Sequence, residues 1–399
     1  MRELRSGWAR TRVGDAFDMQ LGKMLSKDAA VGPSQREYLT NKNVQWDRLS
    51  FDELNYMSFS ESEREKFRLI HEDLLVTEGG EVGRTAIWEE QRAECYFQKS
   101  LHRLRTRGAI EPRYMLHYMA YAARHGLFVD GISQTSIAHL PQDKFAEHLV
   151  AHPVELGEQR RIVEVIDAVS GRERAIEASF AKLRSVRQGV LLASMASIGD
   201  NEPPAGWVRV PLKGVVPKAE YGISEALDRD PQGLPVLRMN NLQNGRPELS
   251  ELRYSPIPVP ERLELRRGDV LFNRTNSIDH IGKSAMWRDE LPRATFASYL
   301  VRVNPDRSQL LPEYLVEWLM HPLIRQRVRS ISTVAVQQVN VNPTRLRELE
   351  IDMPADLTEQ RQIIDSLHSC DEQIEDERAE LAKLRTLKLG LADDLLVGT

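Results

Sequence analysis

The longest regular pattern of apolar and polar positions lies between Glu158 and about Met195, where no proline interrupts the chain. Its core positions recur every seven residues, with further apolar residues that widen the stripe: Ile162, Val169, Ile176, Leu183 and Val190, and beside them Val165, Ile166, Phe180 and Val186. A seven-residue apolar repeat is typical of a long helix that packs against another helix. The pattern predicts such a helix over residues 155–197, with a stripe that needs a partner.

A second stripe of the same kind occupies residues 356–397, at Ile363, Leu367, Cys370, Ile374, Leu381, Leu384, Leu391 and Leu395. Because a Pro/Gly-containing linker at 198–206 and a globular segment separate the stripes, we expect the two helices to pair in antiparallel fashion. At 1.5 Å per residue they would form a coiled coil of roughly 50 Å, with one globular domain at each end and a pseudo-twofold axis between them.

The remaining segments, 1–154 and 207–355, have a different pattern. Short β-branched runs such as "DLLVTEGG" and "DVLFNRT" alternate with Gly, Pro and Asn turns, and each segment contains one helical stretch, "PRYMLHYMAYAAR" or "PEYLVEWLMHPLIRQRV". Such mixtures are typical of α+β domains. The predicted fold class is therefore α+β, with two tandem α/β domains separated by two long helices.

The two halves of the chain repeat one another. The matching stretches are "GWARTRVGDAF" and "GWVRVPLKGVV", "YLTNKNVQ" and "VLRMNNLQ", "DLLVTEGGEVGRTAIW" and "DVLFNRTNSIDHIGKSAMW", "EQRRI" and "EQRQI", and "AKLRSVRQG" and "AKLRTLKLG". All occur in the same order, at offsets of 196 to 201 residues. An internal repeat in constant register indicates a tandem duplication.

Charge is unevenly distributed along the chain. The net charge of −5 argues against a nucleic-acid partner when it is taken as a whole. However, residues 356–394 contain eleven acids and five bases, whereas residues 205–353 contain 21 bases, nearly all arginine, and 18 acids. Arginine suits phosphate and guanine contacts. The second globular segment is therefore compatible with DNA binding.

Several sequence features bear on location and on catalysis. The chain has no run of about 18 apolar residues and no apolar signal core near its start, and its two cysteines suit a reducing compartment, so we expect a cytoplasmic, nucleoid-associated protein without a membrane partner. It also lacks the [D/N/S]-P-P-[Y/F] loop of adenine methyltransferases and any lysine spaced as in PD-(D/E)xK nucleases. We expect no catalytic residue and no bound metal in this chain.

The doubled arrangement of a globular domain, an "EQR" start and an "AKLR" helix resembles the DNA specificity subunit of type I restriction-modification systems. "GDVLFNRTNS" followed by "IGKSAMW" is similar to the glycine-bordered hairpin of their target recognition domains. The resemblance implies that domains 1–154 and 207–355 each recognise one half of a bipartite, asymmetric double-stranded DNA sequence.

The resemblance also implies partners. Two methyltransferase subunits would dock on the helices and modify adenine with S-adenosylmethionine, and restriction motor subunits, which use ATP with Mg²⁺, would join through them in phage defence. The chain itself would bind no cofactor. Two alternatives remain open: a specificity module of another phage-defence modification system, and a coiled-coil adaptor without a DNA role.

Equivalent hairpins hold the first candidates for DNA contacts. They are Thr77, Glu78, Gly79, Gly80, Glu81 and Arg84 in the first copy, and Asn273, Arg274, Thr275, Asn276, Ser277 and Lys283 in the second. Arg274 suits guanine, Asn276 suits adenine, and Glu78 or Glu81 suits cytosine. Arg84 and Lys283 are better suited to phosphate.

Two further sets of loops supply more candidates, with a role as turn or capping residues as the alternative. The second set is Thr40, Asn41 and Asn43 against Arg238, Asn240 and Asn241, and the third is Gln134, Thr135 and Ser136 against Gln337, Gln338 and Asn340. Amide side chains suit adenine edges, which favours a role in base reading.

Overall fold

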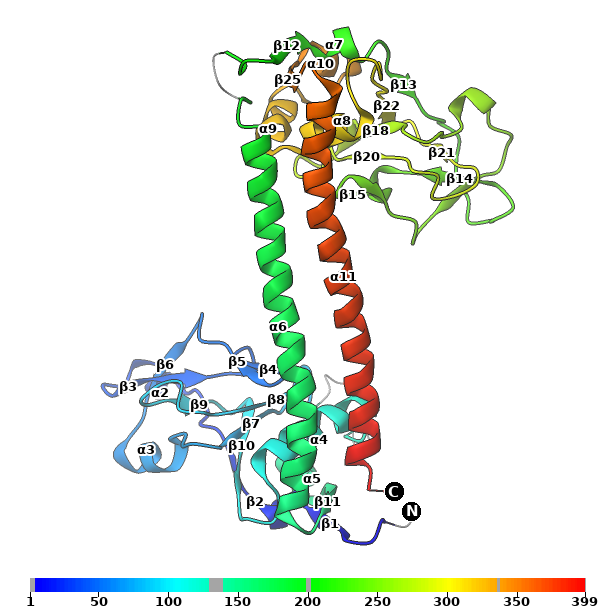
Figure 1. Cartoon of the computed structure of the whole chain (residues 1–399). Coiled ribbons are helices and arrows are strands. Elements are labelled where there is room, and N and C mark those ends of the chain that lie inside the picture. Colours follow the sequence, from blue (N-terminus) through cyan, green and yellow to red (C-terminus); the bar gives the residue numbers. More distant parts are fainter. Residues whose placement is uncertain (1–3, 129–138, 199–201, 336–337, 399) are drawn as a thin grey trace. The chain divides into compact units, whose positions relative to one another are not determined.

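The computed structural model describes residues 4–128, 139–198, 202–335 and 338–398 (Figure 1). Its contacts divide the chain into two compact units, Met1–Ala178 with Ala379–Thr399, and Ser179–Arg378. Two long helices, α6 (Leu156–Ser194) and α11 (Leu357–Leu396), each contribute to both units. We call the globular part before α6 domain 1 (residues 4–155) and that between α6 and α11 domain 2 (residues 202–356).

Domain 1 contains short strands and helices in an α+β arrangement. In chain order these are β1 (Trp8–Arg12), α1 (Val13–Ala16), β2 (Phe17–Leu21), α2 (Lys27–Val31), β3 (Gln35–Leu39), β4 (Val44–Gln45), β5 (Arg48–Leu49), β6 (Asn55–Ser58), α3 (Glu61–Phe67), β7 (Leu74–Thr77), β8 (Thr85–Ile87), β9 (Tyr96–Phe97), β10 (Leu101–Thr106), α4 (Pro112–Arg124), α5 (Gln142–Glu147) and β11 (Leu149–Pro153). The central sheet has the order β2-β10-β7-β8, and β1-β11, β6-β3-β9 and β4-β5 form smaller sheets.

Domain 2 follows the same order. Its elements are β12 (Trp207–Pro211), α7 (Leu212–Val215), β13 (Glu220–Tyr221), β14 (Leu234–Leu237), η1 (Met239–Asn241), β15 (Leu242–Gln243), β16 (Arg246–Pro247), β17 (Arg253–Ser255), η2 (Glu261–Leu263), β18 (Val270–Asn273), β19 (Thr275–Asn276), β20 (Ser284–Met286), β21 (Thr295–Phe296), β22 (Leu300–Arg302), α8 (Pro312–Met320), α9 (Pro322–Ser330), β23 (Thr333–Ala335), β24 (Gln338–Asn340), α10 (Pro343–Glu348) and β25 (Glu350–Pro354). Sheets β13-β22-β18-β20, β12-β25, β17-β14-β21 and β15-β16 match those of domain 1, and β19-β24-β23 is a further sheet. The repeat seen in the sequence is therefore a repeat of topology.

The central strand of each domain is buried on both faces, which explains its continuous apolar run. In β7, Leu74 and Val76 join a core with α4, whereas Leu75 joins the opposite core. In β18, Val270 and Phe272 face α8 in the same way. Successive side chains of a strand point to opposite faces, so each central strand holds two apolar layers together.

The repeated "EQR" motif ties each domain to the start of its long helix. Gln360 is fully buried; its Oε1 accepts from the Leu311 N–H at 3.0 Å, and its Nε2 donates to the carbonyls of Gln309 and Pro354, both at 2.9 Å. Gln159 makes the equivalent three contacts with Glu111, Ala109 and Pro153 in domain 1.

The long helices run antiparallel within each unit, as the sequence predicts. In the first unit, Glu173 pairs with Lys388 at 2.8 Å and Glu177 with Arg385 at 2.7 Å. In the second, the Ser179 hydroxyl donates to Glu377 at 2.7 Å. The predicted α+β fold with two packed long helices is confirmed.

One detail of the predicted stripe is wrong. Val165 and Val186 do not widen the buried face, since each is 45% exposed. Ile166, which the pattern also assigns to the stripe, is buried in the core of domain 1 as predicted. Contacts with domain 1 decide which positions of α6 are buried in this part of the helix, and these positions depart from a strict seven-residue repeat.

We predict that Gln360→Leu lowers the free energy of unfolding by about 2–4 kcal/mol, because three buried or partly buried main-chain groups lose their partner. The matched control is Gln362→Leu, an exposed position on the same helix, expected to change it by less than about 0.5 kcal/mol. Urea unfolding of both variants measures the difference. Equal values for the two would contradict a role of Gln360 as a tie.

Candidate nucleic-acid interface

The hairpins that contain half of the candidate residues form as the sequence predicts, with the same main-chain bonds in both domains. β7 pairs with β8 and β18 pairs with β20, both antiparallel. The turns close through Gly83 and Gly282, whose N–H groups donate to the carbonyls of Thr77 and Asn273. Both glycines have positive φ, +81° and +76°, a conformation that side chains disfavour.

Three hairpin candidates are buried within the domains. The Thr77 hydroxyl donates to the Glu81 carbonyl at 2.6 Å, and the Thr275 hydroxyl donates to Asn340 Oδ1 at 2.6 Å. Asn273 is fully buried, and its Oδ1 has no hydrogen-bond partner in the described part of the chain. These side chains shape the hairpin from inside.

Asn43 and Asn241 are also buried and organise equivalent loops. Asn43 Oδ1 accepts from the Thr40 N–H, and its Nδ2 donates to the carbonyls of Ser50 and Glu53. Asn241 Oδ1 likewise accepts from the Arg238 N–H at 2.9 Å. Asn43 and Asn241 thus act as turn residues, the role that the sequence left open as the alternative to DNA contact.

The other loop candidates lie at or near the surface. Thr40, Asn41 and Arg238 are half-buried and Asn240 is exposed. The Arg238 guanidinium donates to the Glu251 carbonyl at 2.8 Å, and Arg84 donates to the Asn41 carbonyl at 2.7 Å.

In the domain 1 hairpin, two of the three charged side chains contact other side chains of the protein. Glu81 accepts from Trp46 Nε1 at 2.8 Å and lies 3.3 Å from Arg84 Nη1. Glu78 and Gly79 are half-buried, Gly80 is exposed, and Gly79 forms a bridge with His139. Of the three charged hairpin residues, Glu78 alone has no side-chain hydrogen bond or ion pair with another described residue.

The domain 2 hairpin has polar side chains at or near the surface. Ser277 is exposed, Asn276 and Lys283 are half-buried, and Lys283 Nζ donates to Gln243 at 2.9 Å. In the neighbouring β24, Gln338 and Asn340 are half-buried beside β19. Gln134 and Gln337, with Thr135 and Ser136, lie outside the described residues.

Helix α9 is a basic element that the sequence interpretation missed. It carries Arg325, Arg327 and Arg329 with no acid. The sequence pattern predicts one longer helix here, of which α9 would be the end. Arg325 Nη2 donates to the Asp279 carbonyl at 3.0 Å, while its Nη1 is buried without a partner among the described residues. The stretch "RQRVR" in the sequence could have indicated this basic helix.

Burial and a neighbouring cation lower the pKa of two basic side chains near the domain 2 hairpin, Arg325 and Lys283. Burial, followed by repulsion from Arg329, lowers the pKa of Arg325 to about 10. Burial lowers the pKa of Lys283, and repulsion from the Arg325 guanidinium lowers it further. We call Lys283, Arg325 and Arg329 the basic face of domain 2. Positive groups that repel each other favour the binding of an anion.

Two tyrosines beside Arg274 were also missed. Tyr221 on β13 and Tyr299 next to β22 are 50% and 49% exposed, and the Arg274 guanidinium lies 5.2 Å from the centre of the Tyr221 ring. They come from strands distant in sequence, so only the sheet order brings them to the hairpin.

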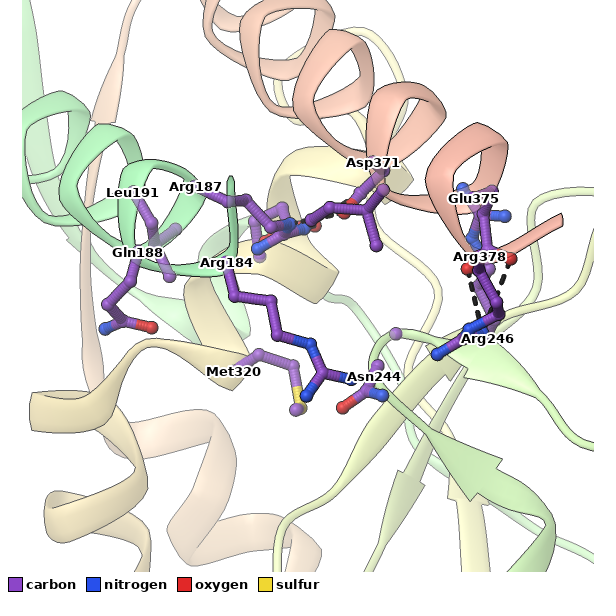
Figure 2. A pocket seen from close by; sticks show the side chains of 13 residues that line it. Arg184, Arg187, Gln188, Leu191, Asn244, Arg246, Met320, Asp371, Glu375 and Arg378 are labelled. Carbon is purple, nitrogen blue, oxygen red and sulfur yellow. Dashed lines mark hydrogen bonds and ion pairs between the residues drawn. The ribbon is translucent and has the colours of Figure 1, made fainter. Parts of the chain in front are cut away.

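A cavity of about 560 Å³ in the second unit has a different character (Figure 2). Most of its charges are paired: Arg187 contacts Asp371 at 2.5 Å and Glu317 at 2.8 Å, and Arg378 contacts Glu375 at 3.0 Å. Arg187 thereby joins α6, α8 and α11. We assign this cavity a structural role.

No group of three His, Cys, Asp or Glu side chains is arranged as metal ligands within the described ranges. Within the same ranges, no helix combines the length and the apolar character that a bilayer span requires.

Comparisons with known proteins agree with this arrangement. The family model described as "Type I restriction modification DNA specificity domain" matches residues 5–180 and 204–386. A putative type I restriction enzyme MjaX specificity subunit from Methanocaldococcus jannaschii is 27% identical over 197 residues, which is 49% of this chain and 46% of that protein. The StySPI specificity subunit from Salmonella potsdam is 26% identical over 45% of this chain and 40% of its own length. The matches thus span less than half of these relatives.

Two solved structures share the fold over nearly the whole chain. A chain from a study of assembly and conformational transition of the type I restriction-modification system has a TM-score of 0.62 at 18% identity, covering 99% of both chains. The S subunit of a type I system from M. genitalium has a TM-score of 0.58 at 12% identity, covering 99% of this chain and 98% of its own.

Specificity subunits are non-catalytic components of restriction-modification complexes, which agrees with the expectation that catalysis lies outside this chain. The family match covers most of the sequence and falls on both copies of the repeat. The chain therefore belongs to the type I restriction-modification DNA specificity family.

Proposed function

We propose that this chain reads a bipartite, asymmetric DNA sequence, with one half-site for each globular domain. The observation that carries the proposal is the pair of hairpins, which share a main-chain framework but differ in their surface side chains. A shared framework with different polar positions is what two domains need to read different sequences by similar geometry.

The basic face of domain 2 supports the DNA partner. Lys283 and Arg325 lie beside the hairpin and have no carboxylate partner among the described residues. DNA phosphates would provide the missing negative charge and would position the hairpin without specifying bases. The acidic segment at 356–394 is unsuited to DNA contact and is assigned to protein partners instead.

The surface candidates divide by role. We assign base reading to Glu78, Arg274, Asn276, Gln338 and Asn340, whose polar groups are only partly buried. The five buried candidates, Asn43, Thr77, Asn241, Asn273 and Thr275, support the loops that present them. Five other surface positions, Thr40, Asn41, Arg238, Asn240 and Ser277, are proposed as contacts with the sugar-phosphate backbone.

The proposal extends to partners and location. Two methyltransferase subunits would dock on the long helices and use S-adenosylmethionine to modify adenine in the bound DNA, in the cytoplasm beside the nucleoid. Restriction subunits using ATP with Mg²⁺ would join that assembly. Modification of a base within a duplex requires that it leave the stack, a step that belongs to the partner enzymes.

A first prediction concerns the basic face. The double variant Lys283→Gln/Arg325→Gln should weaken binding of every duplex to a similar extent, by roughly tenfold or more. It should also reduce the slope of log affinity against log salt by about two, because two phosphate contacts are lost. Fluorescence anisotropy of the complex with its methyltransferase subunits, at several salt concentrations, measures both.

The control for this prediction is Arg229→Gln, which removes an exposed positive charge elsewhere in domain 2. It should leave the slope nearly unchanged. A double variant with wild-type folding and an unchanged slope would show that the basic face does not contact phosphate.

A second prediction tests bipartite reading. Mapping of methylated adenines in a genome that expresses this chain and its methyltransferase should give two short blocks with a fixed gap. Replacing residues 205–353 by the same segment of another family member should change one block only. Absence of a split motif from an assembled complex would refute the proposed function.

A further inference from the structure

Glu78 and Arg274 occupy the same place in the two domains. The N–H of Glu78 donates to the Ser100 carbonyl and that of Arg274 to the Tyr299 carbonyl, both at 3.0 Å. Their own carbonyls accept from Leu140 at 2.7 Å and from Val341 at 2.8 Å. The preceding residues, Thr77 and Asn273, make equivalent bonds across the turn, so the correspondence rests on contacts as well as on alignment.

The two equivalent positions carry opposite charges. Both side chains are half-buried, and neither has a hydrogen bond or ion pair to another charged side chain among the described residues. The Nε of Arg274 is buried without a hydrogen-bond partner. A partly buried charge without a counter-charge costs free energy, and such groups are retained where a ligand completes them.

The surroundings of Arg274 hold its guanidinium in position. Tyr221 supplies a ring face 5.2 Å from the guanidinium carbon, at a place where domain 1 has Leu21 on β2. Stacking on a tyrosine face restrains the guanidinium while its outer N–H groups remain available as donors. Arginine held in this way can approach a base edge with little loss of conformational entropy.

We propose that Glu78 and Arg274 are the matched base-reading residues of the two domains, Glu78 selecting a cytosine and Arg274 a guanine, with Tyr221 as the positioning residue of Arg274. This inference rests on the proposed function and assigns the base chemistry of its central position. A carboxylate accepts from the cytosine N4 amino group, whereas a guanidinium donates to guanine O6 and N7. The opposite polarity makes one backbone position select different bases in the two half-sites.

The test is to determine the methylation motif for the complex with Glu78→Gln, with Arg274→Gln and with wild-type chain. Each variant should lower the preference for one base at one position of one half-site by roughly 10- to 100-fold. The other half-site should be unchanged. The two affected base pairs should lie in different blocks of the motif.

Further variants separate base reading from charge and folding. Arg274→Lys keeps the positive charge, so affinity for duplexes without the motif should be retained while guanine preference falls, because lysine cannot donate to guanine O6 and N7 in the fixed geometry of a guanidinium. Tyr221→Leu should weaken guanine preference in the same half-site, and Tyr221→Phe, which keeps the ring, should restore it. Thermal unfolding of each variant checks that the domain is folded.

Two outcomes would overturn the inference. In the first, folded Glu78→Gln and Arg274→Gln complexes methylate the wild-type motif with unchanged preference. In the second, they lose affinity equally for all sequences, as phosphate contacts would. Failure of the proposed function looks different, since the wild-type complex itself would then give no split motif.

Discussion

The candidate hairpin of each domain is held in place mainly by its own main chain, and the proposed DNA interface depends on that constraint. Gly83 and Gly282 close the turns at positive φ, and a Cβ on either would lie 2.8 Å from an atom of Phe128 or Val328. Backbone groups close both turns, and the Thr77 hydroxyl adds hydrogen bonds from inside the first, so the turns depend little on their surface side chains. Those surface side chains can therefore differ between the two domains while the fold stays the same.

Charge is distributed unevenly between domain 2 and α11. Domain 2 has a face of cations that repel one another, whereas the segment that forms α11 is strongly acidic. On the long helices some charges, such as those of Glu173 and Lys388, pair across the two helices. The cations of the basic face that lack a carboxylate partner among the described residues fit the proposed contact of domain 2 with DNA.

The sequence predicts the parts of the structure that depend on local patterns. The duplication, the long helices and the hairpins follow from periodicity and turn residues, which short-range sequence carries. It does not tell that Asn43 and Asn241 face inward, because an asparagine in a loop suits a turn and a base edge equally. Nor does it place Tyr221 beside Arg274, since that contact depends on β13 and β18 both pairing with β22.

A structure of the chain bound to its methyltransferase subunits and a duplex containing its motif tests the central claim most directly. The account predicts both hairpins in the major groove, with the Arg274 guanidinium about 2.7–3.2 Å from guanine O6 or N7 and the Glu78 carboxylate at the same range from a cytosine N4. Hairpins that face solvent, or that meet only phosphates while other elements contact the bases, would contradict it.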